Sequence, residues 1–205
     1  GISCVITNEH IHELLDLAGF EEVNTVYSGS FPSQMVSGLN DGVSFFNYRG
    51  YYGVSGFGSS NVNSTSNGFM LPVATVITCG TGSFASSNEA LSESFLRAGT
   101  ASNPKGSVVC VGTATLGTHT MFNNIVDMGF YYAALLEGLE TPGAALMYGK
   151  MMLYKNYPSN PSNWCDIFTH WNNLMGESSL QMWTAYPEQV TVTHPYSCLL
   201  YTSPS

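Results

Sequence analysis

The segment at residues 71–84 constrains the fold of this chain more than any other. The run Val73–Thr78 is apolar and mostly β-branched, which favours a buried strand over a helix. Cys79 follows directly, and Gly80 and Gly82 allow the backbone to turn sharply after it. In open α/β sheets, binding and reactive groups lie beyond the carboxyl ends of the strands. Cys79 is therefore the first candidate for a reactive residue.

Strand-like runs alternate with helical patterns along most of the chain. We expect further strands at Ile2–Ile6, Val23–Tyr27, Gly42–Asn47 and Gly106–Gly112, and a last one around Trp183. Helical spacing and Pro or Asn starts predict helices near residues 8–19, 32–39, 88–98, 121–136, 142–154 and 161–174. This alternation is typical of an α/β fold with a mostly parallel sheet covered by helices on both faces.

Right-handed crossovers bring the ends of three of these strands to one rim of the sheet. That rim carries the loops Tyr48–Gly53, Cys79–Phe84 and Thr113–His119. We therefore expect Cys79 to lie beside an aromatic, glycine-containing loop on one side. On the other side we expect a loop that ends in a histidine.

The charge of the chain limits its partners. Only 9% of the residues are charged, and 14 acidic against 5 basic residues give a net charge of −9. This balance argues against nucleic acid and anionic membrane surfaces as partners. No run of about 20 apolar residues is present, so no membrane span is expected. A surface rich in Gly, Ser, Thr and Asn suggests a secreted or cell-surface protein. The oligomeric state is not predicted.

The remaining cysteines do not suggest a metal site. Cys4, Cys110 and Cys165 lie in apolar or helical patterns, and we interpret them as buried small residues. The chain has no CxxC motif and no His/Cys cluster with zinc spacing. We therefore expect no metal ligands and no cofactor.

Both ends of the chain need separate treatment. The chain starts without Met, inside an apolar run, and we interpret residues 1–184 as an N-terminally truncated domain. Residues 185–197 have the alternation of a linker and the start of another domain. Residues 198–205, CLLYTSPS, resemble the translation of a sequencing-library adapter, and we exclude them as an artefact.

Several motifs in the same order resemble the gingipain-like cysteine peptidases, which form peptidase family C25 and have a caspase-like three-layer fold. The motifs that carry the resemblance are Phe46–Gly50 (FNYRG), Thr78–Phe84 (TCGTGSF), Glu89–Leu91 with Phe95–Gly99, Pro104–Gly106 and His170–Glu177. They span most of residues 2–184. The resemblance implies a protein or peptide substrate, and an immunoglobulin-like domain beginning within 185–197. It leaves room for a structural calcium ion but assigns no residues to one.

The resemblance also implies roles for individual residues. The family nucleophile maps to Cys79, and the active-site and oxyanion loop maps to Gly50, Tyr51, Tyr52, Gly53 and Gly80. The family base is a histidine in the pattern Asn-Tyr-x-Gly-His-Gly, and this chain has tyrosine there. Tyrosine, with a pKa of about 10, is a poor base for a thiol near neutral pH. His119, on the same rim, is the candidate for the missing base. Its alternative role is a hydrogen bond to loop backbone at the start of a helix.

Two functions from different classes remain open. One is a secreted endopeptidase that acts by acyl transfer through Cys79, with His119 as base. The other is a pseudopeptidase that keeps the fold as a surface binding or assembly module, because the expected histidine is absent. Asp127 and Asp166 could orient a histidine, but we interpret both as solvated or capping residues. An unrelated doubly wound ligand-binding domain is disfavoured, since the chain has neither GxGxxG nor a Walker pattern.

Overall fold

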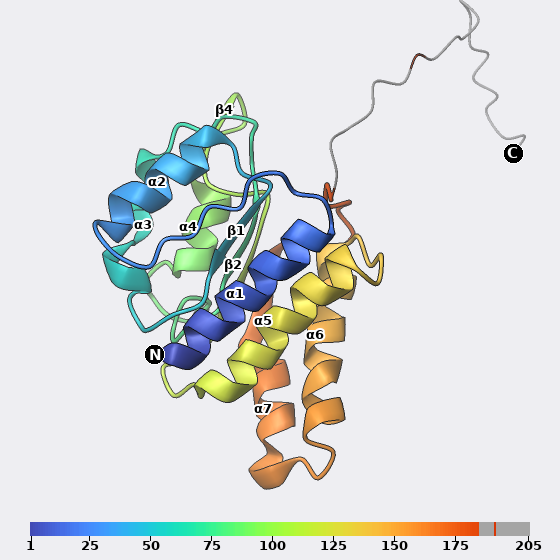
Figure 1. The fold of residues 1–205 in the computed structure, drawn as a ribbon. Coiled ribbons are helices and arrows are strands. Elements are labelled where there is room, and N and C mark those ends of the chain that lie inside the picture. The colour runs from blue at the N-terminus through green and yellow to red at the C-terminus, as the bar shows by residue number, and fades with distance from the viewer. Residues whose placement is uncertain (185–190, 192–205) are drawn as a thin grey trace, which may run out of the picture.

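The computed structural model describes residues 1–184 and residue 191 (Figure 1). Its main sheet has four strands in the order β1-β2-β5-β6. These are β1 (Phe45–Tyr48), β2 (Val73–Val76), β5 (Val109–Thr113) and β6 (Asn172–Gly176). The first three are parallel, and β6 runs antiparallel to β5. A small antiparallel hairpin is formed by β3 (Gly99–Thr100) and β4 (Asn103–Pro104).

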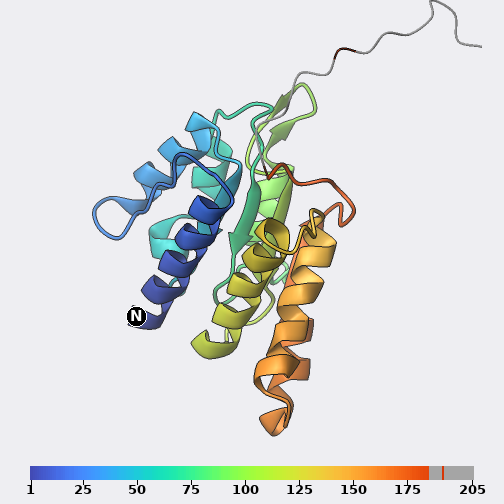
Figure 2. The same ribbon diagram turned by 45° about the vertical axis from the view of Figure 1, so that its right-hand side comes forward.

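Helices cover both faces of the main sheet, as the sequence predicts. The helices are α1 (Ile2–Leu17), α2 (Phe31–Asp41), α3 (Ser59–Ser64), α4 (Leu91–Arg97), α5 (Thr120–Leu135), α6 (Pro142–Asn156) and α7 (Trp164–Trp171). Two single 3₁₀ turns occupy Val54–Gly56 and Pro161–Asn163. Figures 1 and 2 show α1, α5 and α6 on one face and α2, α3 and α4 on the other. The three layers follow from this arrangement.

The central strand β2 explains why its sequence reads as one continuous apolar run. Successive side chains of a strand point to opposite faces. Val73 and the following Ile77 pack into the core beneath α1, α5, α6 and α7. Ala74 and Val76 pack into a second core with residues of α2, α3 and α4. Because both faces are buried, the strand has no polar side, which is typical of parallel sheets between helices.

A close helix crossing holds one of the covering layers together. Gly129 of α5 and Gly149 of α6 face each other, and a Cβ added to Gly149 would lie 2.5 Å from the carbonyl oxygen of Val126. A side chain at either position would push the helices apart. The backbones therefore approach closely only because both positions are glycine.

Four local expectations were wrong. Ile2–Ile6 is not a strand but the start of α1, whose buried residues Cys4, Thr7, Ile11 and Leu14 follow helical spacing. Val23–Tyr27 has no regular structure. The helix predicted over 161–174 ends at Trp171, and β6 rather than the region of Trp183 supplies the last strand.

The position at which β6 starts is set by a tertiary contact, which the local sequence pattern does not reveal. Asn172 is fully buried and pairs with Thr113 at the end of β5. The Thr113 hydroxyl donates a hydrogen bond of 3.0 Å to the Asn172 side-chain oxygen. This pairing converts the chain from helix to strand at the rim of the sheet.

The chain ends lie mostly outside the described residues. The predicted linker and immunoglobulin-like start at 185–197 lie outside them except for residue 191, and the adapter-like segment 198–205 lies wholly outside them. Within the described part, no helix combines the length and apolar character needed to cross a membrane.

Candidate active site

Three loops meet at the carboxyl ends of β1, β2 and β5. The Thr78 hydroxyl donates a hydrogen bond of 3.2 Å to the Gly50 carbonyl, which joins the first two loops. The N–H of Gly80 donates a bond of 2.7 Å to the Thr115 carbonyl, which joins the second loop to the third. The predicted rim is therefore confirmed by direct contacts.

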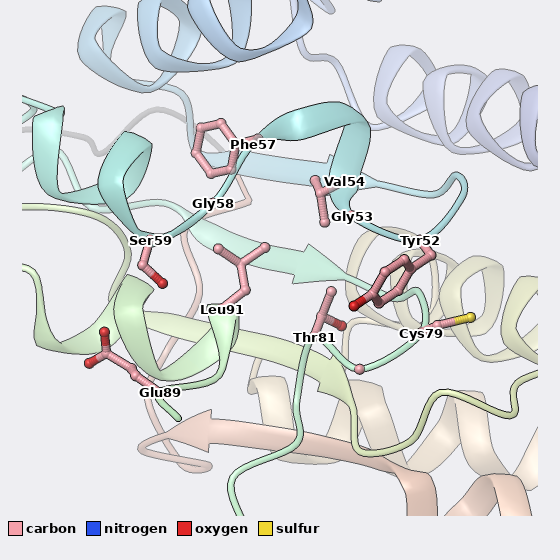
Figure 3. Close-up of a pocket in the computed structure, with 11 residues that line it drawn as sticks. Tyr52, Gly53, Val54, Phe57, Gly58, Ser59, Cys79, Thr81, Glu89 and Leu91 are labelled. Carbon is pink, nitrogen blue, oxygen red and sulfur yellow. The ribbon is translucent and has the colours of Figure 1, made fainter. Parts of the chain in front are cut away.

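Cys79 is the reachable thiol among the described cysteines. Cys4, Cys110 and Cys165 are buried, as predicted, and Cys79 is half-buried; all four are free thiols. The Cys79 sulfur lies 2.9 Å from the hydroxyl oxygen of Thr118. Figure 3 shows this sulfur pointing away from the other labelled side chains of the neighbouring cleft. The thiol therefore faces the third loop rather than the first.

A cleft of about 210 Å³ opens beside the Cys79 loop. Its walls are mixed polar and apolar, with Glu89 as a carboxylate among the lining residues. The Glu89 carboxylate lies 3.4 Å from the Arg97 guanidinium. Tyr52 lines this cleft, and Figure 3 shows its ring beside the loop that carries Thr81. Tyr51 does not line it and is 83% exposed. Tyr52, which is 58% exposed, is therefore the tyrosine of this loop that lines the cleft.

The glycines after Cys79 serve the packing of the loop. Gly80 has a φ of +74°, which disfavours any side chain there. A Cβ on Gly82 would lie 2.7 Å from the carbonyl carbon of Gly112 in β5. Their N–H groups are also occupied, because that of Gly82 donates to the Thr113 carbonyl at 3.0 Å, and Gly80 is bonded as described above.

Other backbone donors remain for an oxyanion. Among the described residues, no acceptor takes the N–H of Cys79 or of Gly53. These two groups come from the second and first rim loops. Of the predicted loop residues, Gly53 and Tyr52 line the cleft beside Cys79 and Gly80, whereas Gly50 uses its carbonyl to hold the loops together.

His119 is the N-cap residue of α5. Its Nδ1 accepts a hydrogen bond of 3.2 Å from the Met121 N–H. Within the described part of the chain, no hydrogen bond joins His119 to Cys79. When Nδ1 accepts, a neutral imidazole carries its proton on Nε2. To receive a thiol proton, the ring must therefore give up this cap, and its role as a base stays a prediction.

Arg49 is the main residue that sequence reasoning missed. Its side chain is only 4% exposed. Nε donates to the Asn124 side chain at 2.7 Å, Nη1 to the Ile77 carbonyl at 2.9 Å, and Nη2 to the Thr120 carbonyl at 3.0 Å. Burial lowers the pKa of Arg49 from its ordinary value, and nearby acidic groups partly oppose this. A lone arginine after a strand gave no sign of these partners.

The expectation that Asp127 is solvated or capping was wrong. Asp127 is fully buried in α5, and neither carboxylate oxygen has a hydrogen-bond partner among the described residues. Burial raises its pKa to about 7, although the Arg49 charge and the nearby Asn47 and Thr75 side chains act in the opposite direction. Asn123, Asp127 and Tyr131 are spaced by four and share a buried face, which is a signal that the sequence did contain.

Asp166 fits its expected role more closely. It lies in the first turn of α7 and accepts a hydrogen bond of 2.7 Å from the Asn160 side chain. For metals, the described residues hold no group of three or more His, Cys, Asp or Glu side chains that could bind an ion.

Comparison with known proteins gives consistent matches over most of the chain. The pattern of peptidase family C25 matches residues 9–183. Gingipain R2 of Porphyromonas gingivalis is 24% identical over 196 residues, which cover 90% of this chain and 26% of that protein. Gingipain R1 of the same organism is also 24% identical over 196 residues, covering 90% of this chain and 19% of that protein. This chain thus spans about a quarter or less of these relatives.

Solved structures give the same fold. The crystal structure of the Arg-specific cysteine proteinase gingipain R superposes with a TM-score of 0.77 at 23% identity, covering 88% of this chain and 43% of that one. A complex of Porphyromonas gingivalis RgpB pro- and mature domains gives a TM-score of 0.78 at 21% identity, covering 86% and 43%. The fold is therefore caspase-like, as the sequence predicts.

Proposed function

Because the chain belongs to peptidase family C25, we propose that it acts as a cysteine endopeptidase with Cys79 as the nucleophile. The single observation that carries this proposal is the position of Cys79. It is a half-buried thiol at the end of a buried parallel strand, beside a cleft and two backbone N–H groups that bond to no acceptor among the described residues. Strand ends of this kind are where α/β proteins carry out chemistry. The substrates are proteins or peptides.

The proposed reaction is acyl transfer in two steps. The Cys79 thiolate attacks the peptide carbonyl carbon, and a C–S bond forms while the carbonyl electrons move to oxygen. The N–H groups of Cys79 and Gly53 stabilise this oxyanion. His119 takes the thiol proton and gives it to the leaving amine as the C–N bond breaks. Water then hydrolyses the thioester, which releases a carboxylic acid and restores the thiol.

A second function is favoured by one observation. Tyr52 lines the cleft in the loop where the family pattern places a histidine, and His119 caps α5 instead of contacting the thiol. These features support a pseudopeptidase that binds peptides in the cleft as a surface binding or assembly module without cleaving them.

A thiol-reactive peptide probe separates the two functions. The full-length protein is labelled beside Cys79→Ala and His119→Ala variants. His170→Ala serves as a control, because His170 is an exposed histidine whose Nδ1 contacts the Asp166 carbonyl. Labelling that is lost in Cys79→Ala supports the peptidase. Equal labelling of wild type and His119→Ala removes His119 as the activator. Absent labelling, together with binding of an uncleavable peptide, supports the binding module.

We also propose that the protein is secreted or carried at the cell surface. The charged fraction of 9% supports this, because polar uncharged residues take most of the surface positions that Lys and Glu usually fill. Fractionation of the producing cells tests it: the protein is expected in the medium or on the envelope, and recovery from the cytoplasm alone contradicts it.

A further inference from the structure

We infer that Arg49 is a positioning residue for Cys79: it holds the two segments that flank the thiol, and its buried charge favours the thiolate form. The inference rests on the proposed function only in taking Cys79 as the nucleophile. It concerns thiol reactivity, which can be measured whether or not a peptide is cleaved.

The first argument is the position of the Arg49 hydrogen bonds. Nη1 binds the carbonyl of Ile77, two residues before Cys79. Nη2 binds the carbonyl of Thr120, two residues after Thr118, whose hydroxyl lies 2.9 Å from the thiol. One planar guanidinium therefore fixes both the strand end that carries the sulfur and the segment that contacts it. Such a fork is rigid, because its donors have a fixed geometry.

The same side chain also secures the first rim loop. Nη1 donates to the Gly50 carbonyl at 3.3 Å, and this carbonyl also accepts from the Thr78 hydroxyl. Arg49 thus contacts all three segments that build the site. A change in its position is expected to move the thiol relative to both neighbouring loops.

The second argument is the charge of Arg49. Its acceptors are the carbonyls of Gly50, Ile77 and Thr120 and the side-chain amide of Asn124, all of which are neutral. None of them balances the positive charge. A buried charge without a counter-ion is unfavourable, so a nearby group gains stability by becoming an anion. A thiolate at Cys79 is such an anion.

Four titratable groups face Arg49 from the elements packed around it. They are Cys4 of α1, Tyr48 of β1, Cys79 of the second rim loop and Asp127 of α5. Cys4 and Asp127 are buried, and Tyr48 donates its hydroxyl to the Tyr51 carbonyl at 3.1 Å. Asp127 is the competitor that matters, because its carboxylate offsets the charge of Arg49 as the pH rises. Removal of the Asp127 carboxylate should therefore favour ionisation of Cys79. Removal of the Arg49 charge should disfavour it.

The test is the pH dependence of Cys79 alkylation by iodoacetamide in the full-length protein. The thiolate sulfur forms a bond to the reagent carbon and iodide leaves. Mass spectrometry of the Cys79 peptide separates this reaction from that of the other cysteines. The variants are Arg49→Met, Arg49→Lys and Asp127→Asn. Lys155→Met, at an exposed lysine near the end of α6, is the matched loss of a positive charge.

We expect Arg49→Met to move the midpoint of the pH profile upward and to lower the rate near neutrality several-fold. Asp127→Asn is expected to move it downward. Arg49→Lys is expected to keep the midpoint near that of wild type because it keeps the charge, while its maximal rate falls because the fork is lost. Lys155→Met is expected to change neither quantity.

Two results would overturn the inference. One is a folded Arg49→Met variant, with wild-type circular dichroism, whose profile superimposes on that of wild type. The other is an upward midpoint shift in both Arg49→Met and Asp127→Asn, which general disruption of the site would produce. If Arg49→Met does not fold, the profiles of Arg49→Lys and Asp127→Asn still test the inference. Arg49-dependent alkylation without peptide cleavage supports this inference while it contradicts the proposed peptidase.

Discussion

The Cys79 sulfur lies 2.9 Å from the Thr118 hydroxyl, so its direct partner is a hydroxyl group from the loop after β5. A hydroxyl can donate a hydrogen bond to a thiolate, but it is not a base that removes a thiol proton near neutral pH. The site therefore separates two roles. Thr118 and Arg49 stabilise the thiolate, and a proton acceptor has to come from another group.

Thr118→Val tests the first of these roles. It keeps the shape of the side chain and removes the hydroxyl, so the thiolate loses a hydrogen bond worth about 1 kcal/mol. We expect Cys79 alkylation at pH 7 to slow by about fivefold, measured by mass spectrometry of the Cys79 peptide. Thr25→Val is the control, because Thr25 is exposed and lies outside the site. An unchanged rate in Thr118→Val would show that this contact does not support the thiolate.

Tyr52→His tests whether the site lacks only its base. Tyr52 lines the cleft beside Cys79, whereas Tyr51 is 83% exposed. A histidine at position 52 therefore places an imidazole in the cleft beside the Cys79 loop, with a pKa near 6.5. We expect peptide cleavage, or probe labelling of Cys79, to rise by at least about tenfold, as base catalysis commonly gives more than this.

Tyr51→His is the matched control for that substitution. It introduces the same side chain one residue earlier, at the position that the pattern Asn-Tyr-x-Gly-His-Gly matches directly but where the side chain is 83% exposed. We expect no gain from it. A gain in Tyr51→His that equals or exceeds the gain in Tyr52→His would contradict the expectation that the base acts from the cleft, which position 52 lines.

Asp127 predicts a pH dependence of stability. Its pKa is raised from 3.8 to about 7 in the folded protein, so the native state binds more protons than the unfolded state between these values. The free energy of unfolding therefore falls as pH rises through this range. The fall is on the order of 4 kcal/mol, since each pH unit of difference corresponds to about 1.4 kcal/mol.

Urea unfolding at pH 5 and pH 8 measures this effect. Asp127→Asn cannot ionise, so its stability is expected to decline less than that of wild type over the same interval. Asp41→Asn, at an exposed aspartate at the end of α2, is the control and should follow wild type. If the stability of wild type and of Asp127→Asn declined in parallel, the pKa of Asp127 would not be raised in the folded protein.

Gly149→Ala and Gly38→Ala are predicted to change stability in opposite directions. A Cβ at Gly149 would meet the Val126 carbonyl at 2.5 Å, so we expect a loss of about 1–3 kcal/mol as α5 and α6 separate. Gly38 in α2 has open space around it, so alanine there should add up to about 1 kcal/mol through helix propensity. Thermal unfolding compares the two. Equal changes in the stability of the two variants would contradict the close crossing of α5 and α6.

The sequence predicted those elements whose local pattern and tertiary environment agree. Val73–Thr78 reads as a buried strand because both faces of β2 are covered, so even its threonines are buried and no charged residue interrupts the run. Ile2–Ile6 is also rich in β-branched apolar residues but lies in a helix. Its burial has helical spacing, and that spacing becomes clear only when the segment is joined to Ile11 and Leu14.

The residues of the candidate site also differ in whether a local pattern reveals them. Cys79 could be predicted because its position after a strand and before glycines is local. Arg49 could not, because its partners Ile77, Thr120 and Asn124 are distant in the sequence and come together only in the folded sheet. Asp127 was missed for a different reason. Its spacing was visible, but an aspartate in a helix is usually solvated.

Mass spectrometry after rapid quenching tests the central proposal most directly. The full-length protein is mixed with an activated peptide ester, and the reaction is stopped within the first turnover. The account predicts that the acyl group of the peptide is found on Cys79 and decays as product forms. Turnover of the ester with no acyl group on Cys79, or equal turnover in Cys79→Ala, would contradict it.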